Sequence, residues 1–574
     1  MKESGKFGFV QAVPLCILAV IRLFISVMLG IWYPAGQVWD DQLMVSYMNL
    51  SAHYKEPVYY ALVKNMGWPA LVSVFSRTGL PYTVLTALLW IGAAVSVFFL
   101  LKRLFEGRLW VAVVGYVYVM FMPQAFDAWS GTRFYRNSAI APFVIITFAF
   151  MIQAVLRARD KGIFKVLSLV LAGVFFSLTY FLKEDGKWIL ACLLVAMLIG
   201  VGHAIYGRKL KDSVAVVVKN ALLVLLPLVI FIAADLGYKG LNDKYFGVFE
   251  VNTRLESEFG DFCAKVYSVE SPNRDIHVWA PYDAIEKVFD ASPALSEHKN
   301  LLNAIMTTSW CDNDIVANPI QGDHFAWILR NCLKAEGMYT SEADVKAFFG
   351  KVNDELDAAF KNGTLKKQSG TVQLFKNTGA FTGEEVKKII GVTGASFKGA
   401  IFLDGYVPGL GEVTDEEIFD NWASIDEAKV YAHVDYLDDY SGQIKKSEKL
   451  IPVIKILFFI YKCINVAFCL LSCGIILFEA VKFFAGLKSL KSYMEKNYKI
   501  FFSAVTALMF VGIAVCYAFS ISWFSTFIFT ESINMTILNF YNIALPGILF
   551  FANVFALYSL YHEIILMRGS KTHE

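Results

Sequence analysis

Two adjacent carboxylates, Asp40 and Asp41, follow a long apolar segment in the run Gln37-Val38-Trp39-Asp40-Asp41-Gln42-Leu43. A carboxylate at the boundary between water and an apolar phase can act as a general base toward a hydroxyl group. Side chains that are adjacent in sequence point in different directions, by about 100° on a helix, so only one of the two can easily be the base. The alternative interpretation is that one of them caps the start of a helix.

Arginine side chains recur in the run from Phe126 to Asn137, which also follows an apolar segment. This run contains Asp127, Arg133 and Arg136. A guanidinium is planar and always charged, which suits the oxygen atoms of a phosphate better than an ammonium does. We therefore predict that Arg133 or Arg136 binds a phosphate, with Asp127 as a candidate ligand for substrate or metal. The alternative is that both arginines contact lipid headgroups.

A shorter charged turn, Lys183-Glu184-Asp185-Gly186-Lys187, separates two further apolar segments. Lys183 is another candidate ligand for a phosphate, and Glu184 and Asp185 are candidate ligands for substrate or metal. A solvated turn between two helices explains the same residues equally well.

Acidic, basic and aromatic side chains also meet in the run from Gly322 to Arg330, which includes Asp323, His324 and Trp327. Aromatic rings can stack on the faces of sugars, and carboxylates can bind their hydroxyl groups. These three residues are therefore candidates for binding a sugar acceptor. The more ordinary interpretation is the start of an amphipathic helix that packs on the apolar part of the chain.

The elements that must position these residues are membrane helices. Of the 574 residues, 56% are hydrophobic and 18% are charged, and the mean hydropathy is +0.51, which excludes an ordinary soluble fold. Crossing a bilayer core of roughly 30 Å takes about 20 apolar residues in a helix. Ten segments are predicted to do so: Phe9–Trp32, Tyr82–Leu101, Leu109–Phe126, Ala139–Leu156, Phe164–Leu182, Trp188–Ile205, Val214–Ala234, Ile454–Phe478, Ile500–Phe519 and Ile537–Leu560.

Basic residues in the short loops predict the orientation of these helices. Such residues gather on the cytoplasmic side of membrane proteins, and here they fall in alternate loops and at the C-terminal tail. Both termini are therefore expected in the cytoplasm. The residues that carry this prediction are Lys102, Arg103, Arg108, Arg157, Arg159, Lys161, Arg208, Lys209, Lys211, Lys482, Lys488, Lys491, Lys496, Lys499, Arg568 and Lys571.

A large polar segment, residues 238–450, interrupts the apolar pattern. It holds 34 acidic and 22 basic residues, whereas the whole chain holds 50 and 52. We predict an extracytoplasmic domain of α+β type inserted between a first membrane module, residues 1–237, and a second, residues 451–574. Apolar spacing predicts helices over Phe325–Ala335 and Glu342–Phe360, and repeated glycines predict a strand-rich or irregular stretch from Thr371 to Val413.

The first extracytoplasmic loop runs from Tyr33 to Pro81 and carries the acidic pair. It continues through two apolar stretches, Pro57–Val63 and Trp68–Phe75, that are too short to cross a bilayer. Their length and aromatic residues predict helices lying in the membrane interface.

This arrangement resembles the GT-C superfamily of membrane glycosyltransferases, in particular the protein-mannosyltransferase and aminoarabinose-transferase type. The likeness rests on the acidic pair after the first helix and the interfacial helices that follow it. It also rests on a second helix that ends in Phe98-Phe99-Leu100-Leu101-Lys102-Arg103-Leu104-Phe105-Glu106-Gly107-Arg108, and on a third that closes in Met122-Pro123-Gln124-Ala125-Phe126. It covers roughly the first 235 residues.

The resemblance implies an enzyme that takes a sugar from a polyprenyl phosphate and passes it to a glycan, lipid or protein acceptor outside the cytoplasmic membrane. It implies Asp40 as the base and Asp41 as a residue that orients substrate or a metal, with Mg²⁺ or Mn²⁺ as candidate cofactors. The leaving lipid phosphate needs cationic stabilisation, for which Arg133, Arg136 and Lys183 are the candidates. Membrane lipids are expected partners, and nucleic acid is not.

Two other classes of protein fit the same pattern of hydropathy. A transporter or lipid flippase more often has internal repeats and glycine-interrupted helices at mid-depth, which are not clear in this sequence. A noncatalytic protein of envelope-polysaccharide assembly would use the inserted domain as a binding surface. The short basic loops and the uncleaved first helix fit a bacterial plasma membrane.

Overall fold

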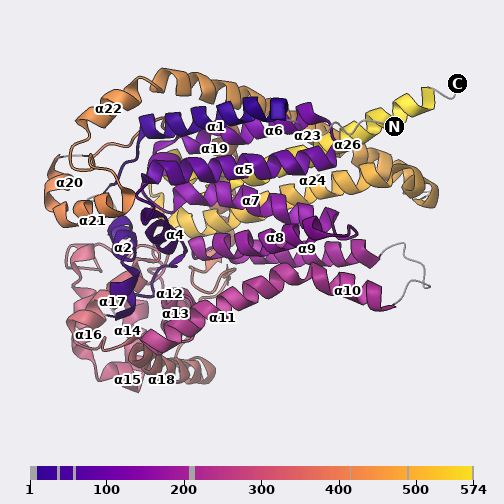
Figure 1. Cartoon of the computed structure of the whole chain (residues 1–574). Helices are drawn as coiled ribbons and strands as arrows, with labels where there is room; N and C mark the ends of the chain where they lie inside the picture. The colour runs from indigo at the N-terminus through magenta and orange to yellow at the C-terminus, as the bar shows by residue number, and fades with distance from the viewer. Residues whose placement is uncertain are drawn as a thin grey trace.

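The computed structural model of the protein describes residues 9–34, 39–55, 60–205, 214–413, 415–487 and 490–571. Four of the predicted cytoplasmic basic residues, Arg208, Lys209, Lys211 and Lys488, lie outside these ranges, as does the first part of the apolar stretch that starts at Pro57. The apolar segments form long helices that run side by side (Figure 1). They are α1 (Phe9–Leu29), α5 (Tyr82–Leu104), α6 (Leu109–Met120), α7 (Asn137–Leu156), α8 (Ile163–Leu182), α9 (Lys187–Ile205), α10 (Val214–Val224), α11 (Leu226–Phe246), α23 (Ile451–Gly486), α24 (Leu490–Ser525) and α26 (Leu545–Lys571).

Eight helices of the described ranges are long and apolar enough to cross a membrane, which confirms a polytopic helical membrane protein. They coincide with eight of the ten predicted segments. The ninth, at 214–234, is a pair of helices, Val218–Val224 and Leu226–Phe246, that bends by 46°. The tenth, Leu109–Ala125, is apolar but shorter. The last predicted segment starts too early, because Met535–Tyr541 forms a separate short helix, α25, ahead of α26.

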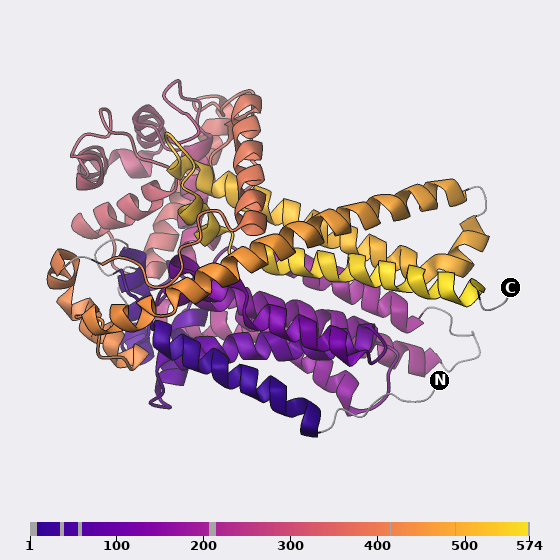
Figure 2. The same cartoon turned by 90° about the horizontal axis from the view of Figure 1, so that it is seen from above.

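The inserted domain gathers at one end of the helices, which we call the domain end (Figures 1 and 2). The start of α1 and the end of α26 lie at the opposite, far end. The starts of α5 and α7 lie together, since the Tyr82 hydroxyl lies 2.5 Å from the Ser138 hydroxyl. Their ends also lie together, since Arg103 donates to the Leu156 carbonyl at 3.0 Å. The two helices are therefore parallel, and the segment 109–125 returns the chain between them.

Short elements cover the domain end of the membrane helices. The first loop contributes α2 (Trp39–Ser46), α3 (Leu50–Lys55) and α4 (Gly67–Ser76), and the loop before α7 contributes η1 (Pro123–Ala125) and η2 (Ala128–Thr132). The predicted interfacial helix Trp68–Phe75 is thus part of α4. The described part of the other predicted stretch, residues 60–63, is a buried turn and not a helix.

The inserted domain has its own hydrophobic core, built around Phe259, Phe325 and Phe349. Trp523 and Phe527, from the end of α24 and the turn after it, belong to the same core and fasten the domain to the membrane helices. Its elements are α12 (Thr253–Glu256), α13 (Glu258–Ser268), α14 (Tyr282–Ala291), α15 (Pro293–Ser296), α16 (Lys299–Met306), η3 (Ser309–Cys311), α17 (His324–Ala335), α18 (Glu342–Asn362), β1 (Thr371–Val372), β2 (Phe381–Thr382) and α19 (Gly383–Phe402). The helices predicted over 325–335 and 342–360 are confirmed by α17 and α18.

The predicted strand-rich stretch from Thr371 to Val413 is wrong over residues 383–402, which form the helix α19. The described strands, β1 and β2, have two residues each and pair antiparallel, with Thr371 opposite Thr382. A capping box fixes the start of α19: the Thr382 side chain accepts from the Glu385 backbone and the Glu385 side chain accepts in return. The capping box favours a helix, and this local effect outweighs the glycine content that led to the prediction of an irregular stretch.

A strap, residues 403–450, leads from α19 back to the membrane helix α23. It contains α20 (Asp415–Asp420), α21 (Trp422–Ala432) and α22 (Ser441–Glu448), which lie at the domain end near α1 and α2 (Figure 1). The Tyr436 hydroxyl accepts from the Ile31 backbone at 2.8 Å, and the Tyr440 hydroxyl accepts from the Tyr33 backbone at 2.9 Å. The strap therefore satisfies the buried backbone groups that follow α1.

Candidate functional site

Asp41 and Arg133 form a fully buried ion pair at the domain end. The Arg133 guanidinium donates from Nε to one carboxylate oxygen at 2.9 Å and from Nη2 to the other at 2.5 Å. The side chains are 0% and 1% exposed, and the Phe540 and Trp129 rings lie 4.8 and 4.9 Å from the guanidinium carbon. The two charged groups hydrogen-bond to each other, and neither side chain faces solvent. The pair therefore connects α2 to the loop before α7, residues 121–136, which we call the second loop.

Asp40 lies beside it in the first turn of α2, yet its side chain is 32% exposed. The difference follows from the helix, which turns successive side chains by about 100°. The Lys64 ammonium, from the turn before α4, donates to Asp40 Oδ2 at 2.7 Å. Burial raises the pKa of the Asp40 carboxyl, but the charges of Lys64 and Arg136 outweigh burial and hold that pKa below its usual value.

Arg136 and Glu184 form a second ion pair nearby, between the start of α7 and the turn before α9. Arg136 donates to Glu184 Oε1 at 2.7 Å, and the same oxygen accepts from the Asn65 backbone at 2.8 Å. The charge of Arg136 holds the pKa of the Glu184 carboxyl well below its usual range, against the opposing effect of burial. In the same turn, Lys183 pairs with Asp185 at 2.9 Å.

The inserted domain contributes further charged and aromatic residues to this site. Arg254, in α12, donates to Asp323 at 2.6 Å, and Asp323 immediately precedes α17. The charged ends of Arg254 and Lys64 each lie 5.2 Å from the centre of the Trp327 ring, which therefore contacts a cation from the domain and one from the first loop. His324 lies elsewhere, in edge contact with Trp310 and Phe527.

We call six of these charged residues the Asp40 cluster: Asp40, Lys64, Arg136, Glu184, Arg254 and Asp323. The structure brings five of the residues singled out in the sequence to this site: Asp40, Arg136 and Glu184, together with Asp323 and Trp327, which contact Arg254. Lys64 and Arg254 were missed. Lys64 carried a weak signal, as a charge between two apolar stretches, whereas Arg254 carried none that spacing could reveal.

Asp127 has a structural role within the second loop. Its carboxylate accepts from the Ser130 backbone at 2.9 Å, from the Ser130 hydroxyl at 2.6 Å and from the Val407 backbone of the strap at 2.7 Å. The side chain is 2% exposed. Burial raises the pKa of Asp127 to about 6. These donors occupy both carboxylate oxygens, so this residue joins two segments of chain.

The fit of a divalent cation can be judged from the acidic pair. Such an ion needs several oxygen ligands aimed at one point. Here Asp40 pairs with Lys64 and Asp41 is turned into the interior toward Arg133, and no group of three or more metal-ligating side chains is found in the described ranges. The two carboxylates as placed do not form a ligand set, so no step below passes through a metal.

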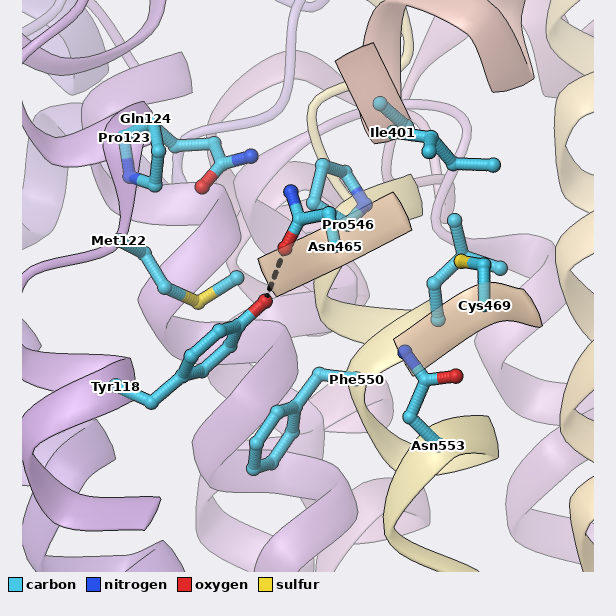
Figure 3. Close-up of a pocket in the computed structure, with 12 residues that line it drawn as sticks. Tyr118, Met122, Pro123, Gln124, Ile401, Asn465, Cys469, Pro546, Phe550 and Asn553 are labelled. Carbon is cyan, nitrogen blue, oxygen red and sulfur yellow. Dashed lines mark hydrogen bonds between the residues drawn. The ribbon is translucent and has the colours of Figure 1, made fainter. Parts of the chain in front are cut away.

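A separate cavity lies between the membrane helices α6, α23 and α26, and is completed by η1 and by the end of α19 (Figure 3). The Tyr118 hydroxyl donates to Asn465 Oδ1 at 2.7 Å across it, and Gln124 and Asn553 also line it. The described lining has no charged side chain and shares no residue with the Asp40 cluster. Its free space is about that of one water molecule, so a phosphate does not fit.

The fold and the cluster together define a polytopic helical membrane protein with a buried network of charges where its inserted domain meets the membrane helices. Comparisons with protein-family models, with curated proteins and with solved structures each return no significant match. The particular activity therefore has to be argued from the geometry and from the resemblance seen in the sequence.

Proposed function

We propose that the protein is a membrane glycosyltransferase of GT-C type that moves a sugar from a polyprenyl phosphate to an acceptor hydroxyl. One observation carries the proposal: a partly exposed carboxylate, Asp40, is held among the cations Lys64, Arg136 and Arg254 at one end of a bundle of apolar helices. We place the bundle in a bacterial plasma membrane with the inserted domain outside and both termini in the cytoplasm.

In the proposed reaction Asp40 removes the proton of the acceptor hydroxyl as its oxygen bonds to the anomeric carbon of the sugar. The bond between that carbon and the phosphate oxygen breaks, and the electron pair leaves with the lipid phosphate. Lys64 and Arg136 stabilise the developing negative charge. Arg133 takes no direct part, because its hydrogen bonds are given to Asp41.

Lys64 links the binding of the donor to the pKa of the proposed base, Asp40. In the structure its ammonium is bound to Asp40 at 2.7 Å. A donor phosphate that takes over Lys64 releases Asp40 from this bond and raises the pKa of its carboxyl toward the value that suits proton removal. The base is thus most basic when the donor is bound.

The test is a transfer assay with labelled polyprenyl-phosphate sugar and membrane glycan, using protein in lipid nanodiscs. Asp40→Asn should lower the rate by about 100-fold or more, the usual contribution of a general base. Asp357→Asn, an exposed carboxylate on α18, is the matched control and should keep the full rate. Full activity in Asp40→Asn with loss in Asp41→Asn would reverse the assignment, and normal activity in the double variant would refute the site.

A transporter or lipid flippase is the second candidate, and the observation that favours it is the uncharged polar contact between membrane helices, in which Tyr118 of α6 donates to Asn465 of α23. A noncatalytic role in envelope-polysaccharide assembly is a third. The same assay separates the transferase from both, because only the transferase yields a new glycosidic bond.

A further inference from the structure

The cavity of Figure 3 lies where membrane helices from both parts of the chain meet the second loop. α6 precedes the inserted domain in the sequence, α23 and α26 follow it, and η1 belongs to the second loop. Polar side chains pair across these helices: Tyr118 donates to Asn465 at 2.7 Å, and Ser472 donates to Asn553 at 2.8 Å. Because lipid offers no hydrogen bonds, polar groups among membrane helices need partners in the protein or in bound water.

Gln124, in η1, has a polar atom without such a partner. The residue is 2% exposed, and its Nε2 donates to the Tyr406 hydroxyl of the strap at 3.1 Å. Its Oε1 is buried and has no hydrogen-bond partner among the described residues. A buried carbonyl oxygen in that state lowers the stability of a fold. Figure 3 shows the Gln124 amide facing the Asn465 amide across the cavity, so a donor placed in the cavity would reach this oxygen.

The size and the lining of the cavity fit a water molecule. The free space is about that of one water molecule, and the described lining has no charged side chain that would select an ion. A buried water makes about two to four hydrogen bonds to polar groups around it. Gln124 Oε1 can accept one of them. Asn465 uses its Oδ1 to accept from Tyr118, and the Nδ2 of the same amide can donate another.

We propose that this cavity binds one ordered water molecule, which accepts from Asn465 and donates to Gln124. The water completes a chain of hydrogen bonds that runs from Tyr406 of the strap through Gln124 to α23, and on through Tyr118 to α6. This chain holds the second loop against the membrane helices. The same loop ends in Arg136, so the water acts on the Asp40 cluster as a positioning element. The inference does not depend on the proposed function.

Hydroxyl-radical footprinting with mass spectrometry tests the water directly, on the full-length protein in lipid nanodiscs. Ionising radiation converts a bound water to hydroxyl radicals in place, and these oxidise a neighbouring methionine even where bulk solvent has no access. Met122 is 2% exposed and lines the cavity, whereas Met120 is 0% exposed and lies outside it. Met122 should therefore be oxidised several-fold faster than Met120 in the wild type.

Two substitutions remove the proposed partners of the water from opposite sides. Gln124→Leu and Asn465→Leu each leave a more apolar cavity, which should stay dry, so the fast oxidation of Met122 should be lost in both. Gln153→Leu is the matched control, because this glutamine is equally buried in α7 and donates to the Ser96 carbonyl away from the cavity. It should keep the oxidation rate of the wild type. Oxidation of Met122 no faster than that of Met120 in the wild type, or fast oxidation that survives both substitutions, would overturn the inference.

Hydrogen exchange tests the positioning role separately. Asn465→Leu leaves the direct bond between Gln124 and Tyr406 in place and removes only the link through the water to α23. Backbone amides of the second loop should exchange faster with deuterated solvent in this variant and should be unchanged in Gln153→Leu. Unchanged exchange in Asn465→Leu, with the fast oxidation of Met122 lost, would overturn the positioning role.

Discussion

At the scale of single residues, two neighbouring aspartates differ in their exposure to solvent and in their ion-pair partners. Asp41 is fully buried against Arg133, whereas Asp40 stays partly exposed and pairs with Lys64. The sequence could predict that only one of them acts as a base, because adjacent side chains diverge. It could not predict the partners, since Arg133 lies 92 residues from Asp41, and Arg254 and Trp327 lie in a different domain. Pairing over such distances depends on the whole fold.

The Lys64–Asp40 contact predicts a shift in the pH dependence of transfer. Without the ammonium, burial raises the pKa of Asp40, so a larger fraction of the base is protonated at low pH. The acid limb of the kcat/KM profile should move to higher pH by about one unit or more in Lys64→Met. Lys64→Arg keeps the charge and should leave the limb close to its original position. An unmoved limb in Lys64→Met would contradict the role given to this contact.

At the scale of elements, the hydropathy pattern was a reliable guide to helices and a poor guide to their interruptions. The break at residues 542–544, between α25 and α26, was missed because the run from Ile537 to Leu560 has no charged residue, although Asn542 and Pro546 lie at the break. In α19, glycines suggested an irregular stretch. Gly391 and Gly394 have open space around them, so a helix tolerates them, and Gly399 is needed where Asn539 approaches within 2.1 Å of the position of a Cβ atom. Composition cannot distinguish these cases.

Asp127, which connects the second loop to the strap, predicts that the stability of the fold depends on pH. Burial raises the pKa of Asp127 from 3.8 to about 6. Between these values the folded protein binds a proton that the unfolded chain does not bind, so the contribution of Asp127 to stability increases as the pH falls from above 6 toward 4. The gain is about 3 kcal/mol at most, at 1.36 kcal/mol per pKa unit.

Thermal unfolding of the wild type and of Asp127→Ala, measured between pH 7 and pH 5, tests this dependence. The variant loses the hydrogen bonds to Ser130 and Val407 and should melt at a lower temperature at every pH. The gap between the two proteins should widen as the pH falls. A gap that narrows on acidification would show that the carboxylate is stabilised in its charged form.

At the scale of the whole molecule, the inserted domain is seated on the end of α24. Trp523 and Phe527 lie in its core, and Gly322 at φ +50° allows the Phe527 ring an approach that a side chain would block, since a Cβ atom would come within 2.2 Å of it. The domain therefore holds Arg254 and Trp327 over the first loop through a contact made by a much later part of the chain.

Truncating this anchor should loosen the domain without touching the Asp40 cluster. Phe527→Ala removes a buried aromatic ring, at a cost of about 3–5 kcal/mol. Backbone amides of α17 should exchange faster with deuterated solvent, and transfer to a glycan acceptor should fall more than hydrolysis of the donor. Phe249→Ala, at a ring that is 50% exposed, is the control and should change neither. Unchanged exchange in α17 would mean that other contacts hold the domain.

The position of Phe527 late in the sequence also determines when the site can assemble during synthesis. A ribosome adds about 5–20 residues per second, so Phe527 is synthesised about 20 to 90 seconds after Lys64. During that interval Asp40 and Lys64 have already been synthesised. The inserted domain, which carries Arg254 and Trp327, still lacks its packing contact with the end of α24. A nascent chain stalled before α24 would carry every charged residue of the cluster and still lack the anchor of the inserted domain, so completion of the cluster is delayed until synthesis is nearly finished.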